Sequence, residues 1–225
     1  MKTRTREPQY EHCLEVAEKN NLTQLGLMTN QVWHEDPRRL GFVLARYKFV
    51  SKMLSGMKNV LEVGCADAFG TRIVLQEVDA ITATDFDPVF VADVKKRMDP
   101  AWKFKCEFHD MIKGPLARKF GGAYAMDVIE HIPESKENKF IGNMAKSLSK
   151  SGVCVIGSPS IQSQAYASPP SKEGHVNCKD APGLKALMSK FFHNVFIFSM
   201  NDEVVHTGFY PMAHYLFAIC CGVKK

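Results

Sequence analysis

The sequence predicts an α/β protein with one doubly wound, mainly parallel sheet. From residue 58 onward, short apolar runs alternate with stretches of helical character, a pattern typical of parallel strands joined by crossover helices. The last two apolar runs have no helix between them, which indicates an antiparallel hairpin at the C-terminal end of the chain. The length of 225 residues, with 45% hydrophobic and 24% charged residues, fits a single globular domain.

The elements follow in order. Residues 8–20 and a longer segment after Pro37 have apolar residues at helical spacing, and Gly56 ends the second segment. We expect these N-terminal helices to pack on the sheet. The core has predicted strands at 59–63, 79–84, 103–107, 122–127 and 152–158, helices near 70–77, 88–98, 135–149 and 181–190, and final strands at 194–199 and 209–219. A long loop rich in Ser, Pro and Gly spans 159–180, and such loops usually carry function.

The loop after the first strand predicts a nucleotide site. Residues 60–70 are a buried strand followed by small residues, and Asp85 ends the next strand twenty-one positions after the first loop glycine. This Rossmann-like spacing places an acid beside a bound ribose. A dinucleotide site needs glycines where this loop has Ala66 and Ala68, and Asp67 would repel a pyrophosphate. The loop suits a ligand with a positive centre and an amino group, such as S-adenosylmethionine.

Residues 58–160 resemble the class I S-adenosylmethionine-dependent methyltransferases. Four motifs of that family match in order, at Val60–Asp67, Ile81–Asp85, Phe108–Met111 and Ala123–Pro133. The resemblance implies one methyltransferase domain over residues 1–225. Its expected parts are an N-terminal helical cap (1–57), a cofactor-binding core (58–160), and an acceptor loop with the terminal hairpin (161–225).

The resemblance also implies which residues bind S-adenosylmethionine. Gly64 lets the methionine part lie against the backbone, and Arg46 holds the methionine carboxylate. Asp85 binds the ribose diol, Phe86 packs on the adenine, and Asp110 accepts from the adenine amino group. The full expected set is Arg46, Glu62, Gly64, Ala66, Asp85, Phe86, Asp110, Met111 and Asp127.

Structural roles stay open for several of these residues. Asp85 would alternatively cap the next helix, Asp110 would cap a turn, and Arg46 would be a surface arginine. Ala66 and Ala68 depart from the family's usual glycines. If either residue needs a positive φ, the strain costs about 1 kcal/mol per residue.

The segment after the fourth strand suggests how an acceptor is activated. If this segment is helical, Asp127, Glu130 and His131 share one face and make half of a divalent-metal site. The pattern resembles the Glu-x-x-Glu-His arrangement of ubiquinone-pathway O-methyltransferases and small-RNA 2′-O-methyltransferases, with aspartate as the first acid. Those groups add a later histidine, which His175 would supply. Three interpretations stay open: a metal on these four residues, His131 or His175 as a catalytic base without metal, or neither role.

The acceptor is expected to be a small hydroxylated molecule such as a sugar or glycan precursor, methylated on oxygen. Residues 159–206 are crowded with Ser, Gln, Asn and His, and this part weakly resembles bacterial polysaccharide-pathway methyltransferases. One alternative is an RNA 2′-O-methyltransferase, favoured by the metal-like motif and the net charge of +5. The chain has no aromatic and basic track for gripping bases and phosphates, so nucleic acid is the less favoured partner. The other alternative is a catalytically inactive cofactor-binding partner subunit.

The seven cysteines indicate a reducing compartment, because their number is odd and they lack framework spacing. Cys65, Cys106 and Cys154 lie in or beside apolar runs and are expected to be buried thiols. The N-terminus is polar and no apolar run is long enough to span a bilayer. We therefore expect a cytoplasmic protein without a membrane partner. The sequence does not set the oligomeric state.

Overall fold

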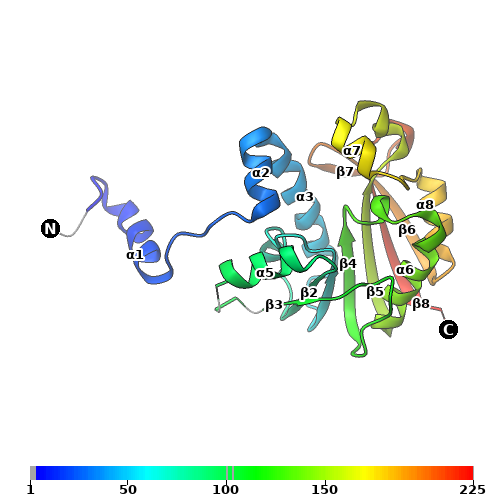
Figure 1. Ribbon diagram of the computed structural model, residues 1–225, viewed down its shortest axis with the longest axis horizontal. Coiled ribbons are helices and arrows are strands. Elements are labelled where there is room, and N and C mark those ends of the chain that lie inside the picture. The colour runs from blue at the N-terminus through cyan, green and yellow to red at the C-terminus, as the bar shows by residue number, and fades with distance from the viewer. Residues whose placement is uncertain (1–3, 100, 103, 225) are drawn as a thin grey trace.

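The computed structural model describes residues 4–99, 101–102 and 104–224. Its centre is one eight-stranded sheet in the order β3-β2-β1-β4-β5-β8-β6-β7 (Figure 1). The five strands that pair in parallel are β1 (Val60–Val63), β2 (Ile81–Asp85), β3 (Phe104–Phe108), β4 (Phe120–Met126) and β5 (Leu148–Pro159). The antiparallel part consists of β6 (Phe192–Asn201), β7 (Val204–His206) and β8 (Tyr215–Val223). The predicted mainly parallel sheet with a C-terminal antiparallel hairpin is confirmed. Lys103, expected to begin β3, lies outside the described residues.

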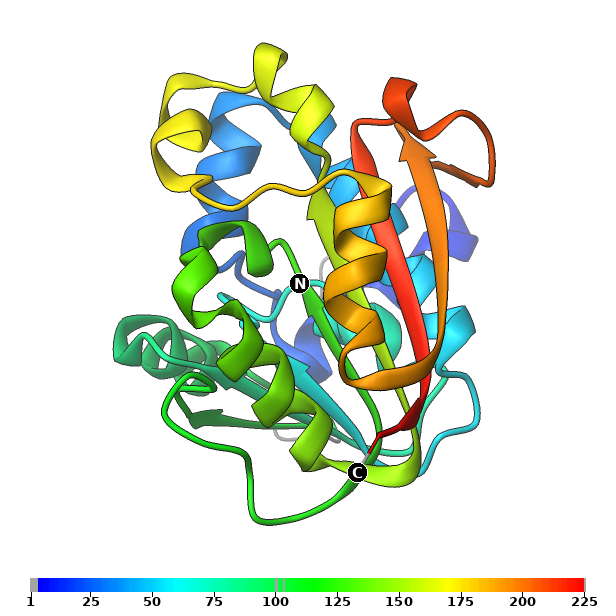
Figure 2. The same cartoon turned by 90° about the vertical axis from the view of Figure 1, so that its right-hand side faces the viewer.

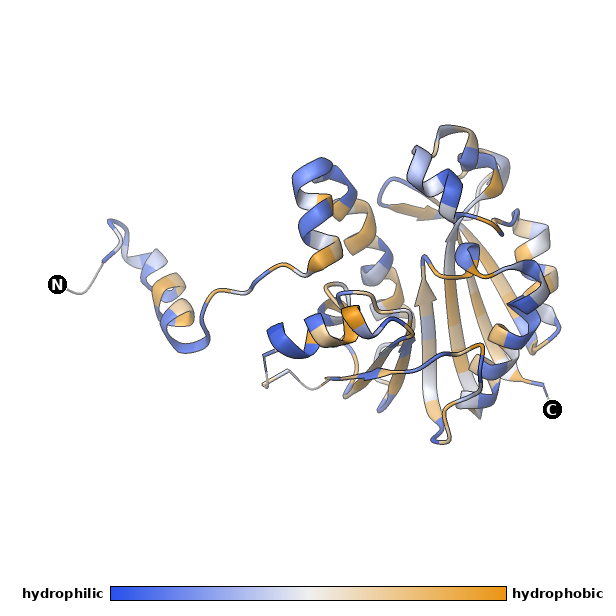
Figure 3. Ribbon diagram, in the orientation of Figure 1, coloured by the Kyte–Doolittle hydropathy of each residue, from blue (hydrophilic) through white to orange (hydrophobic). Residues whose placement is uncertain are grey.

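Helices cover both faces of the sheet, as the doubly wound prediction requires. One face carries α6 (Glu134–Ser147) and α8 (Ala181–Ser189), and the other carries α3 (Arg38–Met53), α4 (Thr71–Val74) and α5 (Pro88–Arg97) (Figure 2). In β1, Leu61 and Val63 join the buried cluster of the first face, whereas Val60 joins that of the second. Successive strand residues point to opposite faces. A strand covered on both sides tends to be apolar along its length. In Figure 3 the strands in the middle of the sheet are mainly pale to orange, whereas blue residues stand out in β2 and β3.

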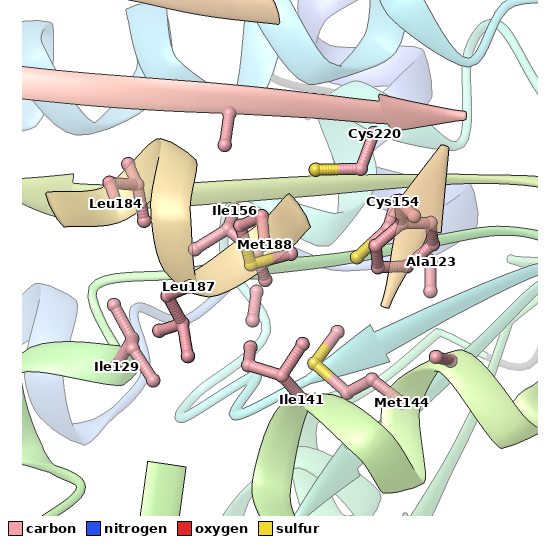
Figure 4. Close-up of a cluster of buried hydrophobic side chains, with 14 of the residues drawn as sticks. Ala123, Ile129, Ile141, Met144, Cys154, Ile156, Leu184, Leu187, Met188 and Cys220 are labelled. Carbon is pink, nitrogen blue, oxygen red and sulfur yellow. The ribbon is translucent and has the colours of Figure 1, made fainter. Parts of the chain in front are cut away.

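Apolar packing on the α6–α8 face fixes the strands from which the site loops leave. Ile141 and Met144 of α6 are fully buried, and so is Met188 of α8. They pack in one cluster with Ala123 of β4 and Ile156 of β5 (Figure 4). Cutting such a large buried side chain to alanine typically costs about 2–5 kcal/mol. The ends of β4 and β5 are thus rigidly placed.

The N-terminal helices divide into two groups. Residues 8–20 form the predicted helical segment, as a 3-10 turn η1 (Pro8–Tyr10) and α1 (Glu11–Asn20). However, α1 has no buried residue and lies apart from the body in Figure 1, so only α3 packs on the sheet as expected. The sequence analysis missed α2 (Leu27–Glu35), in which only Thr29 and Val32 are buried. Within the described ranges no helix has both the length and the apolar character needed to cross a membrane.

The 159–180 segment is not a structureless loop. It contains a 3-10 helix η3 (Ile161–Tyr166) and a short α7 (Pro169–Gly174). Ser160 and Ser168 cap them, since each serine side chain accepts a hydrogen bond from a backbone amide three residues later. The Ser and Pro content that suggested a loop instead marks helix starts. The expected strand 209–219 is also shorter, because residues Tyr210–Met212 form the 3-10 turn η4 and β8 begins at Tyr215.

Candidate active site

A cavity of about 640 Å³ opens at the carboxyl ends of β1 and β4. The chain order reverses between these two strands, and ligands of doubly wound folds bind at such switch points. The cavity volume is in the usual range for small-ligand sites. Its walls come from the β1 loop, the β4 loop, α2, α3 and α7. The sequence-predicted residues that line it are Arg46, Gly64, Ala66, Asp127, Glu130, His131 and His175.

The β1 loop holds a strained backbone against the cavity. Gly64 has a φ of +75°, and a Cβ on it would lie 2.5 Å from Cγ2 of Val128 in the β4 loop. Only glycine fits both restrictions. Ala66 and Ala68 also have positive φ values, of +46° and +55°, which L-residues adopt at a cost. The loop therefore keeps the glycine-like conformation although alanines stand at two positions.

Asp85 supports this loop from the end of β2. Its Oδ2 accepts from the amide of Ala66 at 2.8 Å, and its Oδ1 accepts from the amide of Asp87 at 2.9 Å. The alternative that Asp85 caps the next helix is wrong, because Asp87 is the residue whose side chain caps α5. An ionised carboxylate has about four acceptor positions, so Asp85 can still accept from ribose hydroxyls. Beside it, Phe86 is 68% exposed.

Asp110 and Met111 lie in the loop just after β3. The Asp110 carboxylate accepts from the amide of Ile112 at 2.9 Å, so the expected turn-capping role is present. The Met111 side chain is buried in the core, and its carbonyl accepts from Nδ2 of Asn143 at 2.8 Å. Their contacts with adenine stay predictions. Neither residue is among those that line the 640 Å³ cavity.

Two acids near the β1 loop have structural partners. Glu62 is fully buried and accepts from the hydroxyls of Thr71 at 2.5 Å and Tyr47 at 3.1 Å. Burial raises the pKa of Glu62 to about 7. Glu62 therefore connects β1 with α3 and α4 through these two hydrogen bonds. A direct contact of Glu62 with the cofactor stays a prediction. Asp67 accepts from the amide of Thr29 at 2.6 Å, so it anchors α2 to the loop.

Arg46 and Asp127 form an ion pair across the cavity. Nη1 of Arg46 donates to both Asp127 oxygens, at 2.8 and 2.9 Å, and the guanidinium lies 3.9 Å from the ring centroid of Tyr215. Asp127 has a φ of +56°, and the residues after it form the 3-10 turn η2 (Ile129–His131) instead of the expected helix. The helical spacing that put Asp127 on one face with Glu130 and His131 is therefore absent. Asp127 faces Arg46 instead.

Glu130, His131 and His175 form a cluster, and one possible ligand atom of each lies within 4.8 Å of the others. Glu130 is fully buried, and neither carboxylate oxygen has a hydrogen-bond partner in the described part of the chain. Burial, followed by the nearby Asp127 carboxylate, raises the pKa of Glu130 well above its usual range. A buried acid without partners is unfavourable. Its position therefore suits a cation or a donor hydroxyl.

Hydrogen bonds orient both imidazoles. Nδ1 of His131 lies 2.9 Å from the carbonyl oxygen of Gly174, and Nδ1 of His175 lies 2.8 Å from Oε1 of Gln164. The Gln164 amide is itself oriented, because its Nε2 donates to the carbonyl of Ser160 at 3.3 Å. Carbonyl oxygens only accept, so each Nδ1 carries a proton and each neutral ring keeps its lone pair on Nε2. Burial and the neighbouring His131 lower the pKa of His175.

The sequence analysis missed the partners that orient the histidines. Gln164 stands eleven residues before His175, and no sequence pattern pairs them because η3 and α7 bring them together. The carbonyl of Gly174 is equally hidden, although the sequence analysis did place its neighbour His175 at the site. The catalytic and metal-binding roles of His131 and His175 stay predictions.

Residues 60–152, which run from β1 into β5, match a family model described as a methyltransferase domain. No curated protein matches the sequence. Among solved structures, the chain is similar to the N-methyltransferase NodS from Bradyrhizobium japonicum WM9 in complex with S-adenosyl-L-homocysteine. The identity is 19% over 84% of this chain and 89% of NodS, with a TM-score of 0.60.

Two further structures show the same fold. The TehB-like S-adenosylmethionine-dependent methyltransferase from Corynebacterium glutamicum is 13% identical over 95% of this chain and 96% of its own, with a TM-score of 0.61. The methyltransferase domain of a bacterial CtHen1 is 12% identical over 81% of this chain and 98% of its own, with a TM-score of 0.66.

The fold and the matched core define a methyltransferase domain. The family match over the core and the shared fold support a class I S-adenosylmethionine-dependent methyltransferase. The expected class, enzyme type and cofactor are confirmed.

Proposed function

We propose that this enzyme methylates a hydroxyl oxygen of a small hydroxylated acceptor, such as a sugar or glycan precursor. The proposal rests on the cluster of Glu130, His131 and His175, whose ligand atoms lie within 4.8 Å of one another beside the cofactor cavity. An alcohol holds its proton tightly at neutral pH, so an oxygen acceptor needs a base or a Lewis acid. The cluster offers both kinds of chemistry.

The donor set fits a divalent metal ion. Glu130 has two buried oxygens without partners, and His131 and His175 both present Nε2 because their Nδ1 atoms are engaged. One carboxylate and two imidazoles suit zinc and related divalent metals. A bound metal would supply Lewis acidity to the acceptor oxygen. Asp127 is not needed as a ligand, since it pairs with Arg46.

The protein's main contribution to the reaction is alignment. The new bond joins the acceptor oxygen to the methyl carbon, while the bond from that carbon to the sulfonium sulfur breaks and leaves S-adenosylhomocysteine. Without a metal, the hydroxyl proton goes to Nε2 of His175 or His131 and then to solvent. Where both Nε2 atoms hold a metal, the acceptor hydroxyl would instead be acidified and its proton would pass directly to solvent. The low pKa of His175 keeps its ring neutral and able to accept that proton. Arg46 and Gly64 are proposed to hold the methionine part on the opposite side of the cavity.

The cavity wall supports a polar acceptor. Its lining includes Gln31 of α2, with Ser168 and Ser171 at the start of α7. Figures 1 and 2 both place these two helices at the end of the body to which the carboxyl ends of the parallel strands point. Hydroxyl and amide groups on both sides are able to hydrogen-bond the several hydroxyls of a sugar.

The test is a methyl-transfer assay with labelled S-adenosylmethionine and a panel of nucleotide sugars, oligosaccharides and short RNAs. His175→Ala should lower turnover at least about a hundredfold, while calorimetry finds the affinity for S-adenosylhomocysteine within twofold of wild type. His193→Ala, at an exposed position on β6, is the matched control. Unchanged turnover in His175→Ala would remove His175 from the mechanism. Full activity after chelation would exclude the metal and leave the histidines as bases.

The same assay addresses the two alternatives. A ribose also presents adjacent hydroxyls, and the Glu-His pattern resembles that of small-RNA 2′-O-methyltransferases, so RNA is the second candidate acceptor. Phosphate contacts would make RNA affinity fall steeply with added salt, whereas binding of an uncharged sugar would change little. An inactive partner subunit would bind the cofactor and show no turnover with any acceptor in the panel.

A further inference from the structure

Asn177 joins the two segments that carry the cluster. Its backbone amide donates to the carbonyl of Glu130 at 3.0 Å. Its side-chain Nδ2 donates to the carbonyl of Ile132 at 2.9 Å and to Oε2 of Glu137 at 2.8 Å. The residue is 7% exposed. With three hydrogen bonds, one asparagine therefore connects the segment after α7 with the backbone on both sides of His131 and with Glu137 of α6.

The far end of this contact is anchored in α6. Glu137 is buried and also accepts from Nζ of Lys179 at 2.8 Å, and Lys179 shares an isolated parallel bridge with Ser160. The Lys179 ammonium contributes to keeping the pKa of Glu137 below its ordinary value although burial raises it. An ionised Glu137 is a strong acceptor for the Asn177 amide. The link thus runs from α6 through Asn177 to the backbone on both sides of His131.

We propose that Asn177 is a positioning residue that sets the mutual geometry of Glu130, His131 and His175. The inference rests on the proposed function of that cluster and adds the residue that assembles it. Asn177 touches none of the cluster side chains in the contacts described above. It acts through the backbone.

Each cluster residue depends on this link by a different route. Glu130 is held directly, because its own carbonyl accepts from the Asn177 amide. His175 lies two residues before Asn177 on the same short segment. His131 depends on the carbonyl of Gly174, which belongs to that segment too. Loosening the segment would therefore release the hydrogen bond that fixes the His131 tautomer. Partners that orient metal-binding residues in this way typically change metal affinity by about 10–100-fold.

The variants are Asn177→Ala, which removes both side-chain hydrogen bonds, and Asn177→Asp, which keeps the size and removes the donors. Asn59→Ala is the matched control. Asn59 also makes two hydrogen bonds to backbone, with Lys119 and Gly121, at the amino ends of β1 and β4. Thermal unfolding establishes that each variant folds.

The first readout is the imidazole tautomer, measured by two-dimensional ¹⁵N–¹H spectroscopy at pH 8 and assigned with His131→Ala and His175→Ala. Wild type should show Nδ1-protonated rings for both histidines, and Asn177→Ala and Asn177→Asp should shift at least one ring toward the Nε2-protonated form. The second readout is Co²⁺ titration, in which both variants should raise the dissociation constant at least about tenfold. Affinity for S-adenosylhomocysteine should stay within twofold, and Asn59→Ala should match wild type in all three measurements.

Wild-type tautomers and Co²⁺ affinity in a folded Asn177→Asp would overturn the inference. Equal changes in Asn59→Ala would also overturn it, because the effect would then be general loosening. If wild type itself binds no Co²⁺, the metal part of the proposed function fails. The tautomer comparison between wild type and the Asn177 variants still decides whether Asn177 positions the histidines.

Discussion

The two alanines of the β1 loop allow a quantitative test of backbone strain. Ala66 and Ala68 have φ values of +46° and +55°, so both occupy the left-handed region. They differ in burial, because Ala68 is 6% exposed and Ala66 is only half-buried. Replacing each by glycine removes the same kind of strain but a different amount of buried surface.

The expected changes follow from three terms. An L-residue in the left-handed region destabilises the folded state by about 1–2 kcal/mol, and a change to glycine removes this strain. Glycine also has more conformational freedom in the unfolded chain, which lowers the free energy of unfolding by about 0.5–1 kcal/mol. Ala66→Gly should therefore raise the free energy of unfolding by about 0.5–1 kcal/mol. Ala68→Gly also loses a buried methyl group worth about 0.8 kcal/mol. Its net effect should be close to zero.

Urea unfolding of the two variants beside wild type measures these differences. The slope with denaturant should be unchanged, so that a shifted midpoint reports stability alone. The amide of Ala66 donates to Asp85, and glycine keeps that donor, so the loop contact itself is preserved. A loss of stability in Ala66→Gly, or equal gains at both positions, would refute the reasoning.

Three other predictions concern the cavity and the β1 loop beside it. Gly64→Ala should lower the free energy of unfolding by about 3 kcal/mol through strain and overpacking. The new Cβ would meet Val128, so the double variant with Val128→Ala should recover part of this loss in thermal unfolding. Because burial raises the pKa of Glu62 from 4.5 to about 7, the folded state keeps a proton that the unfolded state loses. Stability should therefore fall as pH rises from 4.5 to 7, and Glu62→Gln should abolish about 3 kcal/mol of that fall in urea titrations at several pH values. Arg46→Gln should weaken binding of S-adenosylhomocysteine at least about tenfold, and Arg46→Lys less. Wild-type affinity in Arg46→Gln would contradict carboxylate binding.

The sheet was predictable because each strand has a strong local pattern. Residues such as Leu61 and Val60 serve opposite faces, so parallel strands appear as continuous apolar runs between turn residues. The second helix, α2, escaped prediction for the opposite reason. It buries only Thr29 and Val32, and its position depends on the tertiary bond from the Thr29 amide to Asp67, which no local pattern reports.

The sequence predicted which residues lie in the site better than it predicted how they are arranged. His175 was placed beside Glu130 and His131 from sequence alone, and the structure brings the three together. Asp127 was placed with them by helical spacing, which fails because its φ is +56° and the turn η2 begins only at Ile129. The partner that it takes instead, Arg46, stands 81 positions earlier. Long-range ion pairs of this kind follow from the fold, and a single sequence contains no signal for them.

Backbone strain gathers beside the candidate site. The described residues other than glycine with positive φ are Asn21, Ala66, Ala68, Asp127 and Asp202. Asn and Asp tolerate the left-handed region, so the two alanines are the unusual members. Both belong to the β1 loop, and Asp127 faces that loop across the cavity, next to the unpartnered Glu130 carboxylate. Departures from local preference in an otherwise consistent fold mark function. Ligands that satisfy these groups should therefore stabilise the folded enzyme in proportion to their affinity.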